Sequence, residues 1–370
     1  MQLIEVTNKR EEKLFLDVVK LIYKDCPEYI RPLDISIENI FNENNIFYRN
    51  DHSKRWILLN NKGQVIGRIA AFINEAINNG KKTLAFGFFE CIDSQEAANI
   101  LFNKVIDFAS TINAEIIEGP VNYGPTHAFW GLLTEGFDKS PSFEVTYNPK
   151  YYINLFDSFG FKVKYHQFTK MHYLDSDNLP DRVNRIADRV RAKEGFSIKT
   201  FNINQFTQFA KYAVDIYNDA WKDNVNFIPA TIETFLRVFK NIKQILDEKL
   251  ILFAFYNGEP ISLLVCIPDP NAIMKDFNGK LNFINKIRFI LKKNLISKVR
   301  VLALAHKSKY KNRGFEAVLF QTLSNYLNSS KKYKELEISW VGSYNGVMLS
   351  ILNSLNGINA KQHTVYIKEI

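Results

Sequence analysis

Two acid–base side chains stand at the ends of expected strands. Glu90 ends the apolar run TLAFGFFE, and His306 directly follows the run VRVLALA. A carboxylate or a neutral imidazole in such a position can accept a proton, so both are candidate general bases. Glu118, His127 and Trp130 belong to an aromatic, Gly-rich segment that could line a pocket with Glu90. The competing interpretation is that the two glutamates are exposed carboxylates at strand ends, that the histidines are ordinary loop residues and that Trp130 belongs to the core.

A basic, glycine-containing loop begins directly after His306. The segment HKSKYKNRGFEAVLF leads from a strand into an expected helix and carries four cations before Gly314. Unpaired backbone N–H groups at such a junction favour an anion, as does the helix dipole. Glu316 falls in the first helical turn, where its carboxylate would repel a bound phosphate. The alternative is a surface loop whose glycine only terminates a turn.

The elements that position these residues occur twice along the chain. Both halves follow the order strand–helix–helix–strand–strand–strand–helix–strand–helix–strand, which suggests an internal duplication. Expected helices include residues 37–48, 95–112, 203–220 and 231–246, and expected strands close the halves at 163–174 and 364–370. A polar stretch separates the halves. The sequence therefore predicts an α/β chain with domains at 1–175 and 195–370, a linker at 176–194 and an insertion at 269–298.

This order, with the residues around Gly314 and Asn345, resembles the GNAT (acyl-CoA N-acyltransferase) superfamily as a tandem pair covering nearly the whole chain. The resemblance implies two GNAT-like domains, each a mixed, mostly antiparallel central sheet flanked by helices. The family's acetyl-CoA motif, Gln/Arg-x-x-Gly-x-Gly/Ala, is matched at Lys311 and Gly314 and departs at Glu316. The implied cofactor-binding residues all lie in the second half: Leu304, Ala305, Lys309, Lys311, Asn312, Arg313, Gly314, Phe315 and Asn345.

Two further features depart from the family pattern. The last helix of many GNAT proteins begins at an Asn and carries, seven residues later, a Tyr that protonates the departing CoA thiolate. Asn345 fits the first position and also suits a helix N-cap, but the second position holds Leu352, which cannot donate a proton. Tyr344 and Tyr366 are the candidate substitutes. The first half has no glycine loop after Glu90, so we expect no phosphate loop there, and its Gly-rich segment resembles runs in an uncharacterised bacterial group of GNAT-like proteins.

The charge of the chain is concentrated in its second half. Residues 1–180 carry a net charge of −4 and residues 181–370 a net charge of +13, with twelve basic residues and one acid between positions 275 and 313. Such a field attracts the phosphates of a cofactor, a nucleic acid or a lipid surface, although a solvated lysine-rich face is the plain alternative.

The insertion has a broad apolar face bordered by cations. We expect it to dock the two halves, with an acceptor-site lid and a membrane-surface helix as alternatives.

Composition excludes several classes of protein. Hydrophobic residues make up 46% and charged residues 24%, as in globular chains, and no apolar stretch approaches a membrane span of about 18 residues. The three cysteines lie far apart without a CxxC pair, which predicts reduced thiols, no metal site and a cytoplasmic protein. We expect an N-acyltransferase that uses acetyl-CoA or another acyl-CoA and a small-molecule amine or peptide acceptor. The alternatives are a degenerate GNAT-like binding or scaffold module, and an aminoacyl-tRNA-dependent transferase of Fem-like type that would bind nucleic acid through residues 275–313.

Overall fold

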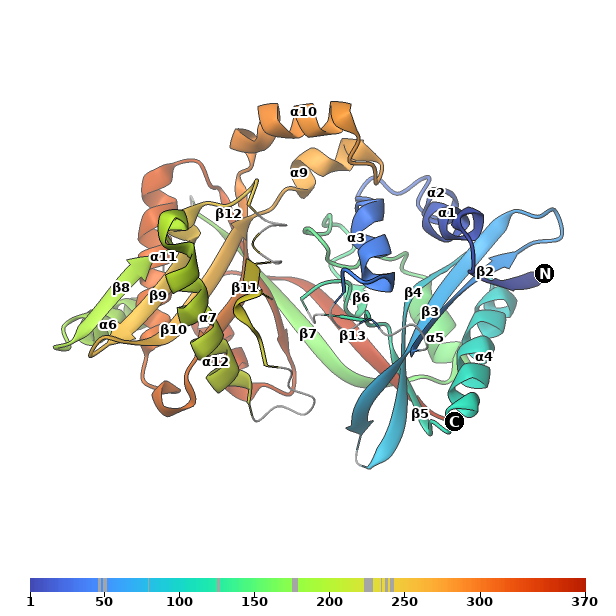
Figure 1. The fold of residues 1–370 in the computed structure, drawn as a ribbon, viewed down its shortest axis with the longest axis horizontal. Helices are drawn as coiled ribbons and strands as arrows, with labels where there is room; N and C mark the ends of the chain where they lie inside the picture. Colours follow the sequence, from blue (N-terminus) through green and yellow to red (C-terminus); the bar gives the residue numbers. More distant parts are fainter. Residues whose placement is uncertain are drawn as a thin grey trace.

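The computed structural model describes residues 1–45, 48, 52–78, 80–124, 127–174, 179–222, 229–233, 235–236, 239 and 243–370. Their strands form one continuous 13-stranded sheet, with helices on both faces (Figure 1). The strand order is β1-β2-β3-β4-β5-β13-β7-β12-β11-β10-β9-β8, and β6 pairs with β13 beside this path. The sheet is mostly antiparallel, with parallel pairs at β4·β5 and β11·β12.

The first half of the chain supplies most of the strands of one side of the sheet. Its strands are β1 (Gln2–Glu5), β2 (Ser53–Leu59), β3 (Val65–Asn78), β4 (Lys81–Cys91), β5 (Ile116–Gly119), β6 (Leu132–Glu135) and β7 (Lys162–Tyr173). Its helices are α1 (Lys9–Asp17), α2 (Val19–Ile22), α3 (Asp34–Glu38) with a 3₁₀ turn at Asn39–Phe41, α4 (Gln95–Thr111) and α5 (Tyr152–Phe159).

The second half repeats this plan with one insertion. Its strands are β8 (Phe196–Thr200), β9 (Ile251–Tyr256), β10 (Glu259–Pro268), β11 (Lys298–His306), β12 (Glu335–Gly342) and β13 (Ile358–Glu369). Its helices are α6 (Asp181–Arg191), α7 (Phe206–Trp221), α9 (Asn271–Met274), α10 (Phe283–Lys292), α11 (Phe315–Ser330) and α12 (Gly346–Ser354). Short 3₁₀ turns lie at Ile203–Gln205, Glu248–Leu250, Lys275–Phe277, Lys293–Leu295 and Ser308–Tyr310. The helix expected at 231–246 lies partly outside the described residues.

The last strand of each half completes the sheet of the other half. Strand β7 pairs with β12, and β13 pairs with β5, so the two closing strands lie side by side in the middle of the molecule (Figure 1). A division of the sequence near residue 175 therefore puts β7 in the first domain by chain order, whereas its hydrogen bonds join it to strands of the second. This exchange joins the two halves through backbone hydrogen bonds between strands.

Helices with one apolar face cover the sheet. Helix α4 begins where the Ser94 Oγ accepts a hydrogen bond from the Ala97 N–H, and it buries Leu101 and Val105 one turn apart. Helix α6 lies within the stretch expected to be a linker. Its Val183 and Val190 nevertheless join the core formed by α11 and the second-half strands, where each such side chain contributes about 1.5–3 kcal/mol by leaving water.

A β-bulge occurs at the corresponding place in each half. In β4, Phe88 and Phe89 face one residue of β3, and in β11 Leu302 faces no residue of β10. The parallel pairing ends before each bulge, at Ala85–Glu118 in one half and at Val301–Ile338 in the other. A bulge turns backbone groups out of the ladder, so it can direct them toward a ligand between the strands.

Candidate functional site

The space between the paired strands is filled in the first half. The Val121 N–H donates to the Phe86 oxygen at 2.8 Å, and a Cβ on Gly87 would lie only 1.7 Å from the Val121 oxygen. The chain leaves β4 for α4 through the three residues 92–94. In the second half, by contrast, Leu302–Leu304 of β11 and Ser339–Trp340 of β12 are only partly buried. The candidate site therefore lies at the open end of β11 and β12.

The loop after β11 presents backbone N–H groups at the start of α11. Asn312 and Gly314 have left-handed backbones, with φ of 62° and 80°, and a Cβ on Gly314 would lie 2.6 Å from the Ile186 Cγ2 atom. Within the described chain, the amides from Asn312 to Phe315 donate to no other residue, whereas the Glu316 N–H is hydrogen-bonded to its own carboxylate. A helix N-terminus with free amides of this kind favours an anion.

The loop cations divide into two groups. Lys307 forms ion pairs with Asp215 at 2.7 Å and Glu259 at 2.9 Å, and Lys309 contacts Glu259 at 3.1 Å. These lysines and the Tyr310 hydroxyl lower the pKa of Glu259 to about 2. Lys311 and Arg313 are exposed and make no ion pair with a residue that the structure describes. Only these two cations are therefore available to an anion at the loop.

Glu316 lies in the first turn of α11, as expected. Its side chain is partly buried, and burial raises the pKa of its carboxyl group. A partly buried acid that is more readily protonated repels a nearby anion less than an exposed one does. The loop therefore retains the geometry of an anion site, weakened by one carboxylate.

His306 lies beside this loop. Its Nδ1 atom is hydrogen-bonded to the Ser262 hydroxyl at 2.5 Å, while its buried Nε2 atom contacts no polar partner in the described part of the chain. Burial, with the charge of Lys311, lowers the pKa of His306 to about 4. The ring is therefore neutral near pH 7 and can accept a proton, although such a low pKa makes it a weak base.

Glu90 lies in a separate, buried environment in the first half. Its carboxylate accepts hydrogen bonds from the Tyr23 hydroxyl at 2.9 Å and the Tyr152 hydroxyl at 2.8 Å, and it lies 3.4 Å from Arg68. Burial raises the pKa of Glu90. It lines a cavity of about 70 Å³. Four strands separate β4 from β11, a distance of about 24 Å at the usual strand spacing, so the structure does not bring Glu90 and His306 together.

The other candidate residues are distributed over several surroundings. Tyr344 is 66% exposed and packs edge-on against Tyr165. Asn345 caps α12, because its Oδ1 atom accepts the Met348 N–H at 3.1 Å. Leu352 is buried in the second-half core. Tyr366 packs against Phe156 in the first-half core.

Core burial also constrains other residues of the expected cofactor set. Phe315 and Ala305 are both buried, so only their backbone groups can face a ligand.

In the first half, His127 is exposed and its carbonyl oxygen accepts a hydrogen bond from Arg300. Glu118 forms an ion pair with Lys164, and the Trp130 N–H donates to the Tyr165 hydroxyl at 2.9 Å.

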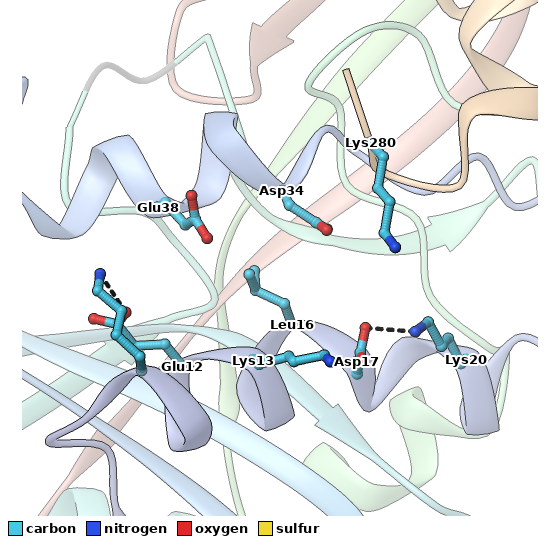
Figure 2. A pocket seen from close by; sticks show the side chains of 9 residues that line it. Glu12, Lys13, Leu16, Asp17, Lys20, Asp34, Glu38 and Lys280 are labelled. Atoms are coloured by element: carbon cyan, nitrogen blue, oxygen red, sulfur yellow. Dashed lines mark ion pairs between the residues drawn. The ribbon is translucent and has the colours of Figure 1, made fainter. Parts of the chain in front are cut away.

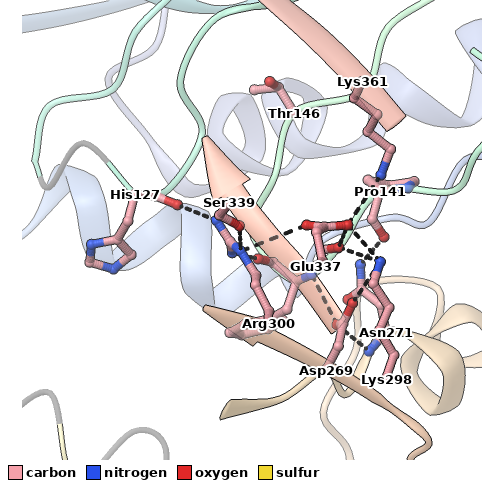
Figure 3. Close-up of polar contacts among 12 residues, drawn as sticks. His127, Pro141, Thr146, Asp269, Asn271, Lys298, Arg300, Glu337, Ser339 and Lys361 are labelled. Carbon is pink, nitrogen blue, oxygen red and sulfur yellow. Dashed lines mark hydrogen bonds and ion pairs between the residues drawn. The ribbon is translucent and has the colours of Figure 1, made fainter. Parts of the chain in front are cut away.

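A buried charged cluster between the two halves was not found by sequence reasoning. Figure 3 shows Glu337 of β12 surrounded by Lys298 at 2.7 Å, Lys361 at 3.8 Å and Arg300 at 4.0 Å. Ser142 from the first half donates to Glu337 at 2.6 Å. The signal in the sequence was a single charge inside each apolar run, VRV and LEI, which marks a buried polar position. This cluster joins β11, β12 and β13 to the first half.

A second, open pocket lies between α1, α2 and α3. It has a volume of about 360 Å³, and acidic and basic side chains alternate along its walls with Lys280 from the insertion (Figure 2). Lys20 there forms an ion pair with Asp17 at 2.8 Å.

The described residues contain no cluster of three His, Cys, Asp or Glu side chains suited to a metal ion. Across these same residues, none of the helices combines the length and apolar character needed to cross a membrane.

The chain is similar over its whole length to other proteins, although no family model matches it. It is 25% identical over 389 aligned residues to the bacterial ceramide synthase of Caulobacter vibrioides (strain NA1000 / CB15N), covering 100% of this chain and 98% of that protein. It is 24% identical to Protein YghO of Escherichia coli (strain K12), covering 98% and 94% of the two chains. A tandem GNAT protein from the clavulanic acid biosynthesis pathway superposes with a TM-score of 0.57 at 11% identity, covering 100% and 98%.

These comparisons define the class of fold. The chain has a tandem GNAT-like fold of two α/β domains, which confirms the fold expected from the sequence. This is an acyltransferase-type fold.

Proposed function

We propose that this protein transfers an acyl group from acyl-CoA to an amine, with the cofactor bound in the second half. The observation that carries the proposal is the row of free amides from Asn312 to Phe315, at a left-handed turn beside the open end of β11 and β12. These groups suit the pyrophosphate of acyl-CoA. When bound, acyl-CoA would supply a thioester whose carbonyl carbon the amine attacks.

Individual residues of the chain would have separate roles in this reaction. Lys311 and Arg313 would neutralise the phosphates, because neither is committed to an internal ion pair. The bulge at Leu302 would direct backbone N–H groups toward the carbonyl oxygen. His306, neutral at pH 7, would accept a proton from the amine through its unpartnered Nε2 atom, which requires the side chains that bury this atom to move apart when substrate binds.

The relatives suggest which amine to test. A ceramide is a fatty amide of a long-chain amino alcohol, so the ceramide synthase of Caulobacter vibrioides makes an amide bond to a lipid amine. The likeness to that protein over the whole chain supports a long-chain amine as acceptor here, with a fatty acyl-CoA as donor. Acetyl-CoA, which the motif alone suggested, then becomes the comparison donor.

Calorimetric titration of acetyl-CoA and palmitoyl-CoA into the purified protein tests the cofactor site. Reversing two exposed charges, Lys311→Glu with Arg313→Glu, should weaken binding about tenfold or more by adding repulsion. Gly314→Trp should abolish binding, because its Cβ would lie 2.6 Å from the Ile186 Cγ2 atom and its φ of 80° disfavours any side chain, so the loop must shift. Gly63→Trp is the matched control, since Gly63 has a similar φ of 75° and faces open space in the first half.

Release of free CoA with a panel of short-chain and long-chain amines then tests the reaction. Saturable binding of an acyl-CoA without turnover of any amine would favour a second candidate, a binding module without catalysis. The buried Leu352 at the position of the family's tyrosine is the observation that favours this candidate. Absence of binding by either acyl-CoA at millimolar concentration would contradict the acyl-CoA proposal itself.

A further inference from the structure

Helix α10, in the insertion of the second half, carries large apolar side chains into solvent. It lies at the edge of the molecule, above α9 (Figure 1). Phe283 is 77% exposed, Leu291 is 75% exposed and Leu295, just after the helix, is 74% exposed. Other exposed apolar residues of this segment are Leu281, Ile284, Ile287 and Ile290. A contiguous apolar patch of this kind is rare on proteins that do not use it for contact.

The opposite face of α10 is the one that packs against the protein. Phe289 and Asn285 are buried, and Phe289 joins a small core with Leu33 of the first half and Phe277 of the insertion. The Gly279 oxygen also accepts the Asp34 N–H at 2.7 Å. The insertion therefore does contact both halves of the chain, as expected. That contact uses only the inner face of α10, so the apolar outer face is not explained by it.

Cations border the apolar outer face on both sides. At about 100° per residue, Phe283, Ile287 and Leu291 share one face of the helix. Arg288 and Lys292 lie along one border of it, and Lys286 and Lys293 lie along the other. These four cations make no ion pair with any described residue, and the sequence has no Asp or Glu from Phe277 to Phe315.

We propose that α10 binds the surface of an anionic lipid bilayer, with its axis parallel to the membrane. Ten residues give a helix about 15 Å long, half of the roughly 30 Å needed to span the hydrocarbon. The apolar face would enter the acyl region while the bordering cations meet lipid phosphates, which is the arrangement of interfacial helices. This inference is independent of the proposed acyl transfer.

Charge favours a bilayer over the other occupants of this face. A second copy of the chain, related by a two-fold axis, would bring two rows of cations together without acids to neutralise them. A nucleic acid would pair with the cations but leave the apolar side chains in water. An anionic bilayer satisfies both the apolar face and the charges at once.

Co-sedimentation of the full-length protein with vesicles tests the proposal. The probes are vesicles of phosphatidylcholine alone and vesicles in which about a third of the lipid is phosphatidylglycerol. The triple variant Phe283→Ser, Leu291→Ser, Leu295→Ser should bind the anionic vesicles about 100-fold more weakly, since three large side chains no longer leave water. The control replaces three exposed apolar residues elsewhere, Val163→Ser, Val347→Ser and Ile358→Ser, and should bind like the unaltered protein.

The expected result is strong binding to anionic vesicles, weak binding to neutral ones, and weaker binding at high salt. A second variant, Lys286→Gln with Arg288→Gln and Lys292→Gln, should lose the preference for anionic lipid while keeping its fold, because all three side chains are exposed. The proposal is overturned if the unaltered protein does not sediment with anionic vesicles or if the triple serine variant binds equally well. It is also overturned if the serine substitutions instead convert a stable dimer to a monomer or abolish RNA binding.

Discussion

Replacing Glu337 by Gln removes the charge at the centre of the cluster that joins the two halves. The carboxylate is 1% exposed, and nearby cations hold its pKa well below its ordinary value against the opposing effect of burial. Its partners are Lys298, Lys361 and Arg300, which in the variant would be left with Asp269 as the remaining buried carboxylate. Glutamine preserves the size of the side chain, so the variant isolates the loss of charge.

The cost follows from burial of the remaining cations. Removing one partner of a buried ion pair costs about 3–5 kcal/mol, because the other charges stay desolvated. The Gln oxygen can still accept from Lys298 and Ser142, so we expect the lower end, about 3 kcal/mol. With a urea m-value of about 3 kcal/mol/M for a chain of this size, the unfolding midpoint should fall by about 1 M.

Equilibrium unfolding in urea, followed by tryptophan fluorescence at pH 7, measures this shift. Glu335→Gln is the matched control, since Glu335 is partly exposed on the same strand and should change stability by less than about 0.5 kcal/mol. Adding Lys361→Met to Glu337→Gln should recover part of the loss, because it removes one of the uncompensated cations. A loss below about 1 kcal/mol for Glu337→Gln, or a double variant as unstable as the sum of its parts, would refute the reasoning.

Four further variants test other parts of the structure. Burial lowers the pKa of His363 to about 4. As the pH falls, His363 is therefore protonated in the unfolded chain before it is protonated in the folded chain, and the free energy of unfolding should fall by up to about 3 kcal/mol between pH 6.5 and 4. His363→Gln should flatten that slope in urea unfolding. Asn345→Ala should cost about 1 kcal/mol by removing the α12 cap, measured by thermal unfolding. Leu352→Tyr should cost about 1–3 kcal/mol in the same assay by overpacking the core. Glu316→Gln should tighten acyl-CoA binding several-fold in calorimetry by removing a repelling charge.

Each of these expectations has a contrary result. An unchanged pH slope in His363→Gln would mean that another group accounts for acid destabilisation. If Asn345→Ala retained its stability but lost acyl-CoA affinity, Asn345 would be a ligand contact rather than a cap. A Leu352→Tyr variant with wild-type stability and new transferase activity would show that the position faces the site. Weaker acyl-CoA binding in Glu316→Gln would show that the carboxylate supports the loop.

Several elements could be read from the sequence because their patterns are local. The apolar runs before Glu90 and His306 form strands, and the expected helix at 95–112 corresponds to α4, with Ser94 as its cap. The helix expected at 37–48 was wrong after Phe41, where the helical conformation ends with a 3₁₀ turn. Three of the next four residues are asparagines, whose side chains compete for backbone groups, as when Asn45 donates to the Ile40 oxygen. Residues 46 and 47 of the expected helix lie outside the described residues.

The candidate site was only partly predictable. The free amides around Gly314 follow from a local glycine turn and were anticipated. The separation of Glu90 from His306 was not, because both end similar strands and only the strand order puts four others between them. The exposure of α10 was likewise undecided, since an apolar stripe looks the same in sequence whether a partner covers it or not.

The sequence by itself determined the duplicated α/β pattern, the basic loop and the concentration of charge in the second half. These properties depend on residue type and on spacing over a few residues. Only the tertiary structure decided that β7 and β13 exchange between the halves, that the gap between β4 and β5 is filled while β11 and β12 stay open, and that Glu337 holds three cations in the interior. Such features arise from contacts between residues far apart in the sequence, from a few tens of positions for Glu337 and its cations to more than two hundred for β5 and β13. These contacts pack through shape and charge and leave no periodic trace in the chain.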